Sequence, residues 1–480
     1  MKNNEWQADY FSDLVNQGLN SILKLAIGDL MTFTPPRRNT LIAIAILTIT
    51  LNACYLPGLL INGSQPVSRS TATRSEPTAT ALQHPATLSP TSTATITMTP
   101  TPTATLSPAP TATPAYSPRL IAYFYGQNRS NQVDEIPLGS LTDVLYAFIG
   151  ISNDGTCRIL DPALDGTNFQ RLKQMKAQFP AVHMLISIGG YGGSARFSDV
   201  AVSQDARSRF VASCVALMRD HGMDGIDVDW EYPVAGGLAG NSHRPDDTQN
   251  FTALMGEFRR QLDRQGQADG QAYLLSLAAP AGPTEIPHFD LAQLSPLVDW
   301  ITLMAYDFTT GSSPITNFNA PLYPVPGEPG NHSRNADAAV QAYLAAGVPP
   351  AKIVLGVPFY VRAWRGVPAG EDGLYQANAG PYRDPRAPAG TWGEGGEIGY
   401  RELKKYYLDT WQRFWQDQAQ VPWLYNAENQ VWVTYDDPQS LAAKANYARA
   451  RGLGGVSIWQ ISSDDQDHSL VKAITAHLFP

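Results

Sequence analysis

Cysteine is scarce in this sequence, which contains only Cys54, Cys157 and Cys214 among its 480 residues. An odd and sparse set excludes the dense disulfide framework that stabilises small secreted domains. Cys157 and Cys214 can pair only if the fold brings them together. We expect them to be buried free thiols instead, because an unpaired cysteine packs as a small hydrophobic residue.

Positive charge is also in deficit. Lys and Arg total 34 against 43 Asp and Glu, which gives a net charge of −9. A nucleic-acid partner requires a basic face, so the charge balance argues against one. Hydrophobic residues make up 43% of the chain, enough for one large core. The length is long for one domain and short for three.

The apolar run near the N-terminus, Leu41–Leu51, is too short to span a bilayer comfortably. Arg37 and Arg38 precede it, as in a signal peptide, and Met31 is an alternative to Met1 as the true start. The run ends in Leu-Asn-Ala-Cys, which resembles the lipobox of bacterial lipoproteins. The resemblance implies that Cys54 is lipidated and tethers an extracellular protein to the membrane. A plain signal peptide or an uncleaved anchor is the alternative.

The next segment lacks aromatic residues and any apolar pattern. No aromatic lies between Tyr55 and Tyr116, and from Ser64 to Pro118 the chain is almost all Thr, Pro, Ser and Ala. Such a stretch cannot bury enough apolar surface to offset its ordering entropy. We therefore divide the N-terminal part into a signal segment, 1–54, and a disordered linker, 55–118. The linker is expected to act as a stalk rather than as a tail without a role.

From residue 119 onward, eight short apolar runs alternate with helical patterns. They are rich in β-branched and aromatic residues, as strands buried on both faces are. The eight runs are Leu120–Tyr125, Val144–Ile151, His183–Ile188, Gly225–Glu231, Tyr273–Ala279, Trp300–Tyr306, Ile353–Phe359 and Gly455–Trp459. This alternation predicts an α/β fold of the (β/α)8 TIM-barrel class. A doubly wound sheet is the alternative, but no Gly-rich phosphate turn follows the first run.

The barrel domain is expected to span 119–480 and to carry an insertion. About 95 residues separate the seventh and eighth runs, too many for one crossover. We assign 365–434 to a small inserted domain before the helix that follows strand seven, and we expect its aromatic residues to deepen a flanking cleft. Its tryptophans are Trp392, Trp411, Trp415, Trp423 and Trp432.

The fourth predicted strand carries the strongest chemical signal. Side chains alternate faces along a strand, so Asp227, Asp229 and Glu231 point the same way, into the barrel. Three adjacent carboxylates repel one another when ionised, which forces proton sharing and separates their apparent pKa values. A catalyst that needs a protonated carboxylic acid near neutral pH accepts this cost. Glu231, at the carboxyl end of the strand, is the expected acid.

Two other interpretations of the acidic strand are weaker. An exposed strand with solvated acids conflicts with the apolar residues between them. A metal site would resemble a calcium loop, but the central Gly and distal Glu of that loop are absent. We therefore expect no metal.

The acidic strand and its surroundings resemble family 18 of the glycoside hydrolases, the chitinase family. Asp224–Glu231 meets the family pattern D-G-x-D-x-D-x-E in full, and Ser187–Gly190 meets the pattern S-x-G-G. Met304–Asp307 matches M-x-Y-D, and Trp459 matches the Trp that ends strand eight. The four motifs occur in the correct order on the predicted strands. The resemblance covers the whole globular region, 119–480.

The resemblance implies a retaining, substrate-assisted mechanism without a cofactor. Glu231 would protonate the glycosidic oxygen and later act as base toward water. The 2-acetamido oxygen of the substrate would attack the anomeric carbon and form an oxazolinium intermediate, while Asp229 binds the acetamido N–H. Asp227 would share a proton with Asp229, and Tyr306 would hold the acetamido group for in-line attack.

The resemblance also implies a set of substrate contacts. Trp459 would floor the subsite of the reacting sugar. The other implied contacts are Tyr123, Phe148, Tyr232, Met304, Asp307, Tyr360 and Arg362. Tyr191 stands where many chitinases have a stacking Trp, and Val361 stands where Gly is frequent. These departures concern substrate length and subsite preference, not the chemistry.

We therefore predict a monomeric chitinase that acts on chitin or chito-oligosaccharides, chains of β-1,4-linked N-acetylglucosamine. A related hydrolase of peptidoglycan or N-glycan cores is the first alternative, because it would share the catalytic strand. A non-catalytic chitin-binding lectin is the second. Such lectins lose the terminal Glu or the middle Asp, and both are present here.

Overall fold

The computed structural model describes residues 116–387, 391 and 393–479. The signal segment, Cys54, Trp392 and most of the predicted linker lie outside the described residues. None of the helices within the described ranges is long and apolar enough to cross a membrane.

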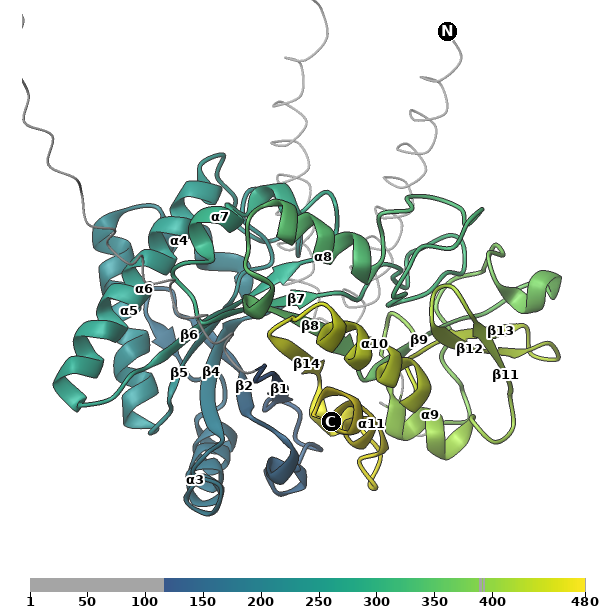
Figure 1. The fold of residues 1–480 in the computed structure, drawn as a ribbon, viewed down its shortest axis with the longest axis horizontal. Helices are drawn as coiled ribbons and strands as arrows, with labels where there is room; N and C mark the ends of the chain where they lie inside the picture. Colours follow the sequence, from purple (N-terminus) through teal and green to yellow (C-terminus); the bar gives the residue numbers. More distant parts are fainter. Residues whose placement is uncertain (1–115, 388–390, 392, 480) are drawn as a thin grey trace, which may run out of the picture. The chain divides into compact units, whose positions relative to one another are not determined.

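Eight parallel strands close into a barrel within the described residues, which confirms the predicted fold class (Figure 1). Each strand pairs with the next one along the barrel, and the last pairs with the first, as in Arg119 opposite Gly455. The barrel strands are β1 (Arg119–Tyr125), β2 (Asp143–Ile151), β4 (His183–Gly189), β5 (Gly225–Asp229), β6 (Leu274–Pro280), β7 (Trp300–Met304), β8 (Ile353–Pro358) and β14 (Gly455–Trp459).

Strands β5 and β7 end two residues earlier than the sequence predicted. Beyond the end of β5, the backbone forms hydrogen bonds with side chains instead of with neighbouring strands. The amide of Glu231 donates to Ser194 Oγ at 2.8 Å, and its carbonyl accepts from Asn241 Nδ2 at 2.9 Å. Glu231 and Tyr306 therefore stand just beyond the carboxyl ends of their strands, where barrel enzymes place their active sites.

Most of the helices cover the outside of the barrel, α9 belongs to the insertion, and several helices begin at a side-chain cap. Ser203 accepts a hydrogen bond from the first turn of α5, and Asp437 and Ser440 form a reciprocal capping box at α10. The helices are α3 (Pro162–Gln178), α4 (Phe197–Ala201), α5 (Gln204–Asp220), α6 (Asp247–Asp269), α7 (Leu291–Leu294), α8 (Ala336–Ala345), α9 (Tyr400–Tyr406), α10 (Pro438–Ala450) and α11 (Ser469–Leu478).

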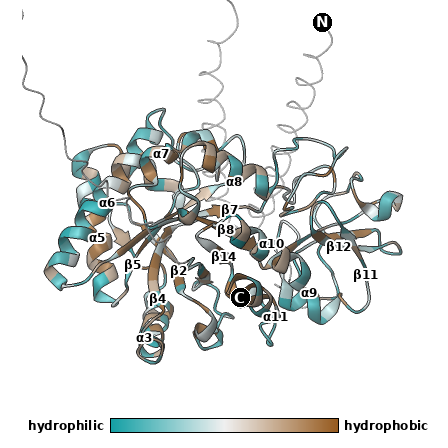
Figure 2. Cartoon of the chain, in the orientation of Figure 1, coloured by the Kyte–Doolittle hydropathy of each residue, from teal (hydrophilic) through white to brown (hydrophobic). Residues whose placement is uncertain are grey.

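The apolar core has an outer and an inner part. The outer part packs between strands and helices, and Figure 2 shows the barrel strands largely in hydrophobic colours with mixed colours on the helices. The inner part fills the barrel with side chains such as Leu145, Leu185 and Val354. Because strands are covered on both faces, they read in the sequence as continuous apolar runs.

A second sheet follows strand β8 and is antiparallel. Its strand order is β10-β9-β13-β12-β11. The strands are β9 (Tyr360–Trp364), β10 (Glu397–Gly399), β11 (Gln412–Gln416), β12 (Val421–Asn426) and β13 (Val431–Thr434). The sheet thus includes five residues before position 365, where the sequence placed the start of the insertion. Strand β9 follows β8 after a single residue, so no turn signal separates the two sheets.

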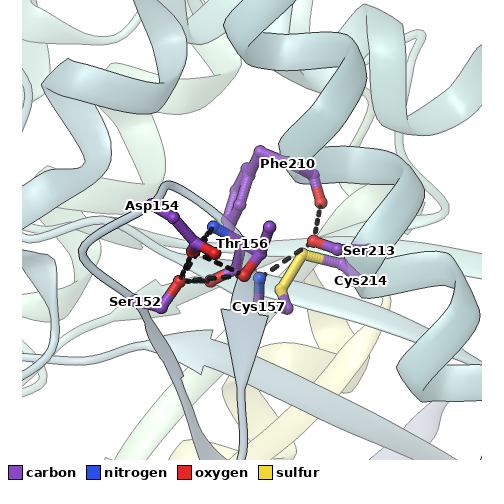
Figure 3. Close-up of a disulfide and its surroundings, with 7 residues drawn as sticks. All are labelled: Ser152, Asp154, Thr156, Cys157, Phe210, Ser213 and Cys214. Carbon is purple, nitrogen blue, oxygen red and sulfur yellow. Dashed lines mark hydrogen bonds between the residues drawn. A yellow bond between two sulfur atoms is a disulfide. The ribbon is translucent and has the colours of Figure 1, made fainter.

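Cys157 and Cys214 form a disulfide, so the expectation of free thiols was wrong (Figure 3). Cys157 lies on β3 (Cys157–Arg158), which folds back antiparallel onto the end of β2, and Cys214 lies on the buried face of α5. Their Cα atoms are 5.1 Å apart, within the range that a disulfide requires. The sequence alone could not show that this short hairpin carries Cys157 over α5.

Replacing both cysteines by serine should lower the free energy of unfolding by about 2–4 kcal/mol, because the bond closes a long loop in the unfolded chain. The separation is 57 residues. Denaturant unfolding of the protein, purified under oxidising conditions and measured with and without reductant, gives the size of the effect. Reductant should bring the wild type to the stability of the double variant and leave the variant unchanged. A wild type that is insensitive to reductant would mean that the two thiols are free.

Candidate active site

The acidic residues of β5 face the barrel interior, and the apolar residues between them face the helices. Trp230, for example, is fully buried and stacks on Phe197 with ring centroids 5.4 Å apart. Asp227 and Asp229 lie on the opposite face, at 0% and 4% exposure. The alternation read from the sequence therefore places carboxyl groups inside the barrel.

Asp227 is held by three hydroxyl groups. One carboxylate oxygen accepts from Tyr123 Oη at 3.0 Å and from Ser187 Oγ at 2.7 Å, and the other accepts from Ser276 Oγ at 2.7 Å. Burial raises the pKa of Asp227, and the three hydrogen bonds oppose this rise because they favour the charged form. Ser276 was not predicted as a site residue from the sequence. Its only indication there is a hydroxyl group within an apolar strand.

Asp229 has a different environment. Burial, followed by the charges of Glu231 and Asp227, raises its pKa well above the usual range. Among the described residues, one of its buried carboxyl oxygens has no hydrogen-bond partner. A buried polar atom without a partner is costly, so this oxygen is available to a bound group or to a neighbouring side chain that turns.

Glu231 lines the cleft directly above this pair. Burial raises its pKa to about 7, with a further rise from the charge of Asp307, and a hydrogen bond with Tyr232 opposes them. A carboxyl group with this pKa is about half protonated at neutral pH, so it can act as a general acid there.

A cleft of about 1500 Å³ opens at the carboxyl ends of the barrel strands. It is larger than the 300–1,000 Å³ that typical small-molecule pockets occupy. Trp459 lies on its wall and packs against Phe148 and Tyr125, with ring centroids 5.5 and 6.3 Å apart. These rings offer flat apolar surface in the same cleft as Asp229 and Glu231.

The structure brings most of the predicted site residues together around this cleft. Lining it are Phe148, Tyr191, Asp229, Glu231, Tyr232, Met304, Tyr306, Asp307, Tyr360, Arg362 and Trp459. Tyr123 does not line it, contrary to the sequence prediction. It is 2% exposed and lies beneath the cleft, because its hydroxyl is engaged with Asp227.

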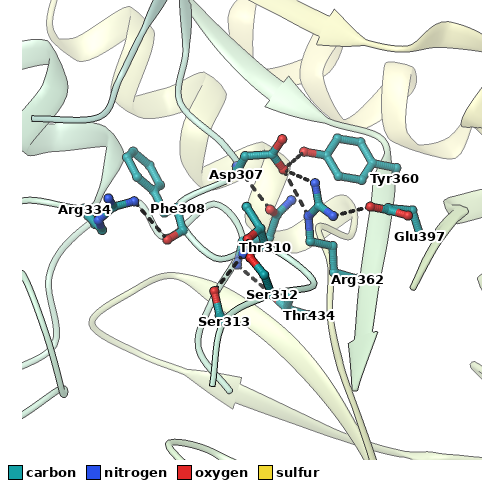
Figure 4. Close-up of polar contacts among 11 residues, drawn as sticks. Asp307, Phe308, Thr310, Ser312, Ser313, Arg334, Tyr360, Arg362, Glu397 and Thr434 are labelled. Atoms are coloured by element: carbon teal, nitrogen blue, oxygen red, sulfur yellow. Dashed lines mark hydrogen bonds and ion pairs between the residues drawn. The ribbon is translucent and has the colours of Figure 1, made fainter. Parts of the chain in front are cut away.

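An ion-pair network joins the barrel to the second sheet at this site (Figure 4). Arg362 donates to Asp307 through Nε at 3.1 Å and Nη2 at 2.6 Å, and it also pairs with Glu397. Tyr360 donates its hydroxyl to the same Asp307 oxygen. Asp307 adopts a φ of +58°, and its amide is fixed by Asn319 Oδ1 at 3.1 Å. The network fixes the carboxylate whose charge raises the pKa of Glu231.

The sequence suggested that the tryptophans of the insertion deepen the cleft, but those in the described part of the chain, Trp411, Trp415, Trp423 and Trp432, do not line it. Trp423 and Trp432 lie in the apolar core of the second sheet, and Trp411 packs against Tyr407 with centroids 4.8 Å apart. The insertion instead contributes polar groups to the cleft, among them Glu394 and Glu397. Sequence composition could not distinguish a tryptophan that lines a cleft from one that fills a core.

Taken together, the fold and the site define a TIM-barrel hydrolase: Glu231, a carboxyl group with a raised pKa, stands above two buried aspartates at the carboxyl end of the barrel. No group of three or more His, Cys, Asp or Glu side chains in the described part of the chain is arranged to hold a metal ion. The family model for glycosyl hydrolases family 18 matches residues 119–464. The chain belongs to this family of glycoside hydrolases.

Individual relatives agree with this assignment. Chitinase A1 of Niallia circulans is 39% identical over 351 residues, which cover 70% of this chain and 48% of that protein. Chitinase B of Serratia marcescens is 33% identical over 389 residues, covering 70% of this chain and 75% of the relative. Chitinase ChiA74 from Bacillus thuringiensis superposes with a TM-score of 0.70 at 31% identity, covering 76% of this chain and 70% of that structure. The chain thus spans about half the length of the first of these relatives.

Proposed function

We propose that the protein is a chitinase that hydrolyses β-1,4-linked N-acetylglucosamine chains with retention of configuration. The observation that carries the proposal is the pairing of Glu231, whose pKa is about 7, with a buried Asp229 that has an unpartnered carboxyl oxygen. The relatives named chitinases support this substrate class.

Glu231 supplies the proton in the first step of the proposed reaction. The acetamido oxygen of the sugar at the reacting position attacks its own anomeric carbon while the bond to the leaving oxygen breaks. That oxygen takes the proton of Glu231 and departs as a hydroxyl group. Glu231, now a carboxylate, removes a proton from the incoming water, which opens the oxazolinium ring and restores the acid.

The two aspartates divide the handling of charge. Three hydroxyl donors favour the anionic form of Asp227, so a proton shared by the pair rests preferentially on Asp229. The free oxygen of Asp229 accepts the acetamido N–H and orients the attacking group. Tyr306, which lines the cleft and packs edge-on against Tyr360 at 6.2 Å, holds the acetamido group from the other side.

Two other carboxylates on the cleft wall are held by an arginine. Asp307 and Glu397 both pair with Arg362, which is 8% exposed. A carboxylate paired with a buried arginine is a poor nucleophile toward an anomeric carbon, because attack would leave the arginine unpaired. This arrangement supports a nucleophile that belongs to the substrate.

Replacing Asp307 with Asn should move the alkaline limb of the kcat/KM profile to lower pH. The charge of Asp307 raises the pKa of Glu231, so its removal lowers that pKa, and the protonated form is lost at a lower pH. The shift is measured on chito-oligosaccharides across the pH range. Glu397→Gln is the matched control, since it removes the other carboxylate partner of Arg362 and should leave the alkaline limb in place. Equal shifts in both variants would contradict the assignment.

Product analysis on three substrates side by side tests the proposed function. Chitin, peptidoglycan and a high-mannose glycopeptide are digested with equal amounts of protein, and the products are identified by mass spectrometry. We expect chito-oligosaccharides from chitin and little release from the other two. Muropeptides or a cleaved glycan core without products from chitin would favour the alternative hydrolases, and binding to chitin without any product would favour a lectin.

We also propose that the protein is exported and tethered through Cys54. Disulfides such as Cys157–Cys214 persist in oxidising compartments outside the cytosol, which supports export. Labelling with a radioactive fatty acid should mark the wild-type chain and not the Cys54→Ala variant. Label that persists in the variant, or release of the unlabelled wild type into the medium, would contradict the anchor.

A further inference from the structure

The hairpin formed by β2 and β3 projects beyond the barrel and forms one wall of the cleft. The pairing of β2 with its barrel neighbour β4 ends at Ile149, and only Gly150 and Ile151 then pair with β3. At about 3.3 Å per residue, the hairpin stem extends roughly 7 Å past the barrel edge. The cleft wall here includes Gly150, Ile151, Asn153, Arg158 and Leu160. We call these five residues the hairpin wall.

Two paired residues would hold the hairpin only weakly, because a ladder this short is marginal by itself. Further contacts attach the hairpin to the helices. The disulfide binds Cys157 to α5, and the amide of Cys157 donates to Ser213 Oγ of the same helix at 2.9 Å (Figure 3). At the other end, the fully buried Asp165 accepts from the amide of Leu160 at 3.2 Å. Both ends of the wall are therefore tied to the barrel's helices.

The turn of the hairpin is also ordered by its own hydrogen bonds. The amide of Ser152 donates to the carbonyl of Thr156 at 2.8 Å, and Thr156 Oγ1 donates to Asp154 at 2.8 Å. Gly155 adopts a φ of +77°, which a three- to four-residue hairpin loop requires at this position. None of these groups has a part in the proposed chemistry.

Side chains alternate along β3 in a way that leaves its outer face without partners. Cys157 and Ile159 turn toward the core, whereas Arg158 and Leu160 turn into the cleft. Leu160 is 38% exposed and lies over Gly150, where an added Cβ would meet it at 2.6 Å. Within the described residues, the side chain of Arg158 makes no hydrogen bond or ion pair. An exposed apolar side chain and a guanidinium that can donate hydrogen bonds thus face the cleft side by side.

We infer that the hairpin wall binds a sugar unit of the chitin chain distant from the cleaved bond, with Arg158 and Leu160 as the residues that determine specificity. The wall belongs to the same cleft as Glu231 and Trp459, so a chain seated on Trp459 continues along it. Leu160 covers the apolar face of the sugar, and Arg158 donates to its hydroxyl or acetamido oxygens. The disulfide holds the wall in position. The inference rests on the proposed chitinase activity.

Kinetics on oligosaccharides of different length test the inference. In Arg158→Ala and Leu160→Ala, kcat/KM for chitohexaose should fall about two- to tenfold, the size expected for one or two lost net contacts, while kcat/KM for chitotriose stays unchanged. Arg209→Ala is the control, because Arg209 is exposed on α5 and does not line the cleft. Losses that are equal for both lengths, or absent for both, would overturn the inference.

The Cys157→Ser/Cys214→Ser double variant tests the role of the disulfide at a temperature where it remains folded. It should show the same selective loss on chitohexaose. Unchanged discrimination between the two lengths would show that the disulfide does not position the wall. A wild type that cleaves neither oligosaccharide would instead refute the proposed function, so the two failures are distinguishable.

Discussion

Glu231→Gln is expected to lower kcat on chito-oligosaccharides by about 10²- to 10⁴-fold, the usual contribution of a general acid. Glutamine keeps the shape and the hydrogen bonds of the side chain but carries no proton that it can donate to the leaving oxygen. KM should change little, because the residue contacts the substrate mainly in the transition state. Steady-state kinetics with a chromogenic chito-oligosaccharide measure the loss.

The matched control is Glu285→Gln, which removes a carboxylate from the wall of the same cleft. It should lower kcat by less than about tenfold, since no proton transfer is assigned to it. Thermal unfolding should give the same Tm for both variants and the wild type. If Glu231→Gln retains more than a few per cent of wild-type activity, another group donates the proton.

Removing the N-acetyl groups from the substrate should reduce cleavage by at least about 10³-fold, because the neighbouring acetamido oxygen then no longer provides its high effective molarity. Chitosan and cello-oligosaccharides have the same linkage and lack this nucleophile. The cleft offers no replacement at Asp307 or Glu397, which are paired with Arg362. The rates on chito-oligosaccharides and on these analogues are compared at equal concentration.

A partly acetylated chitosan gives an internal control within one substrate. Each cut leaves the sugar of the reacting position at the new reducing end, so every such end should carry an N-acetyl group. Mass-spectrometric sequencing of the products reads these ends directly. Glucosamine at a substantial share of new reducing ends would refute the role of the acetamido group.

The barrel and the acidic strand were predictable because both rest on periodic patterns along the chain. Strands covered on both faces leave uninterrupted apolar runs, and the alternation of Asp227, Val228 and Asp229 fixes which face holds the carboxyl groups. The predicted ends of β5 and β7 were wrong by two residues. Side chains distant in the sequence, such as Ser194, take the place of the last hydrogen bonds between strands. No local sequence pattern predicts such partners.

The remaining features depend on contacts between segments far apart in the sequence. Ser276 is 49 residues from Asp227, and Cys157 is 57 residues from Cys214. A serine in a strand and a cysteine in a helix have many ordinary environments, so neither residue type indicates its partner. The same limit applies to Trp423 and Trp432, which fill the core of the second sheet.

Non-proline cis peptide bonds also carry no sequence signal. They occur at Ala147–Phe148, Glu231–Tyr232 and Trp459–Gln460.

The anomeric form of the first product tests the central claim, substrate-assisted hydrolysis by the acidic strand, most directly. Chitohexaose is mixed with the wild-type protein, and proton NMR spectra are recorded before the anomers equilibrate. Retention through an oxazolinium intermediate predicts that the new reducing ends appear first as the β-anomer and then mutarotate. An initial α-anomer would mean direct displacement by water with inversion and would contradict the roles given to Asp229 and Glu231.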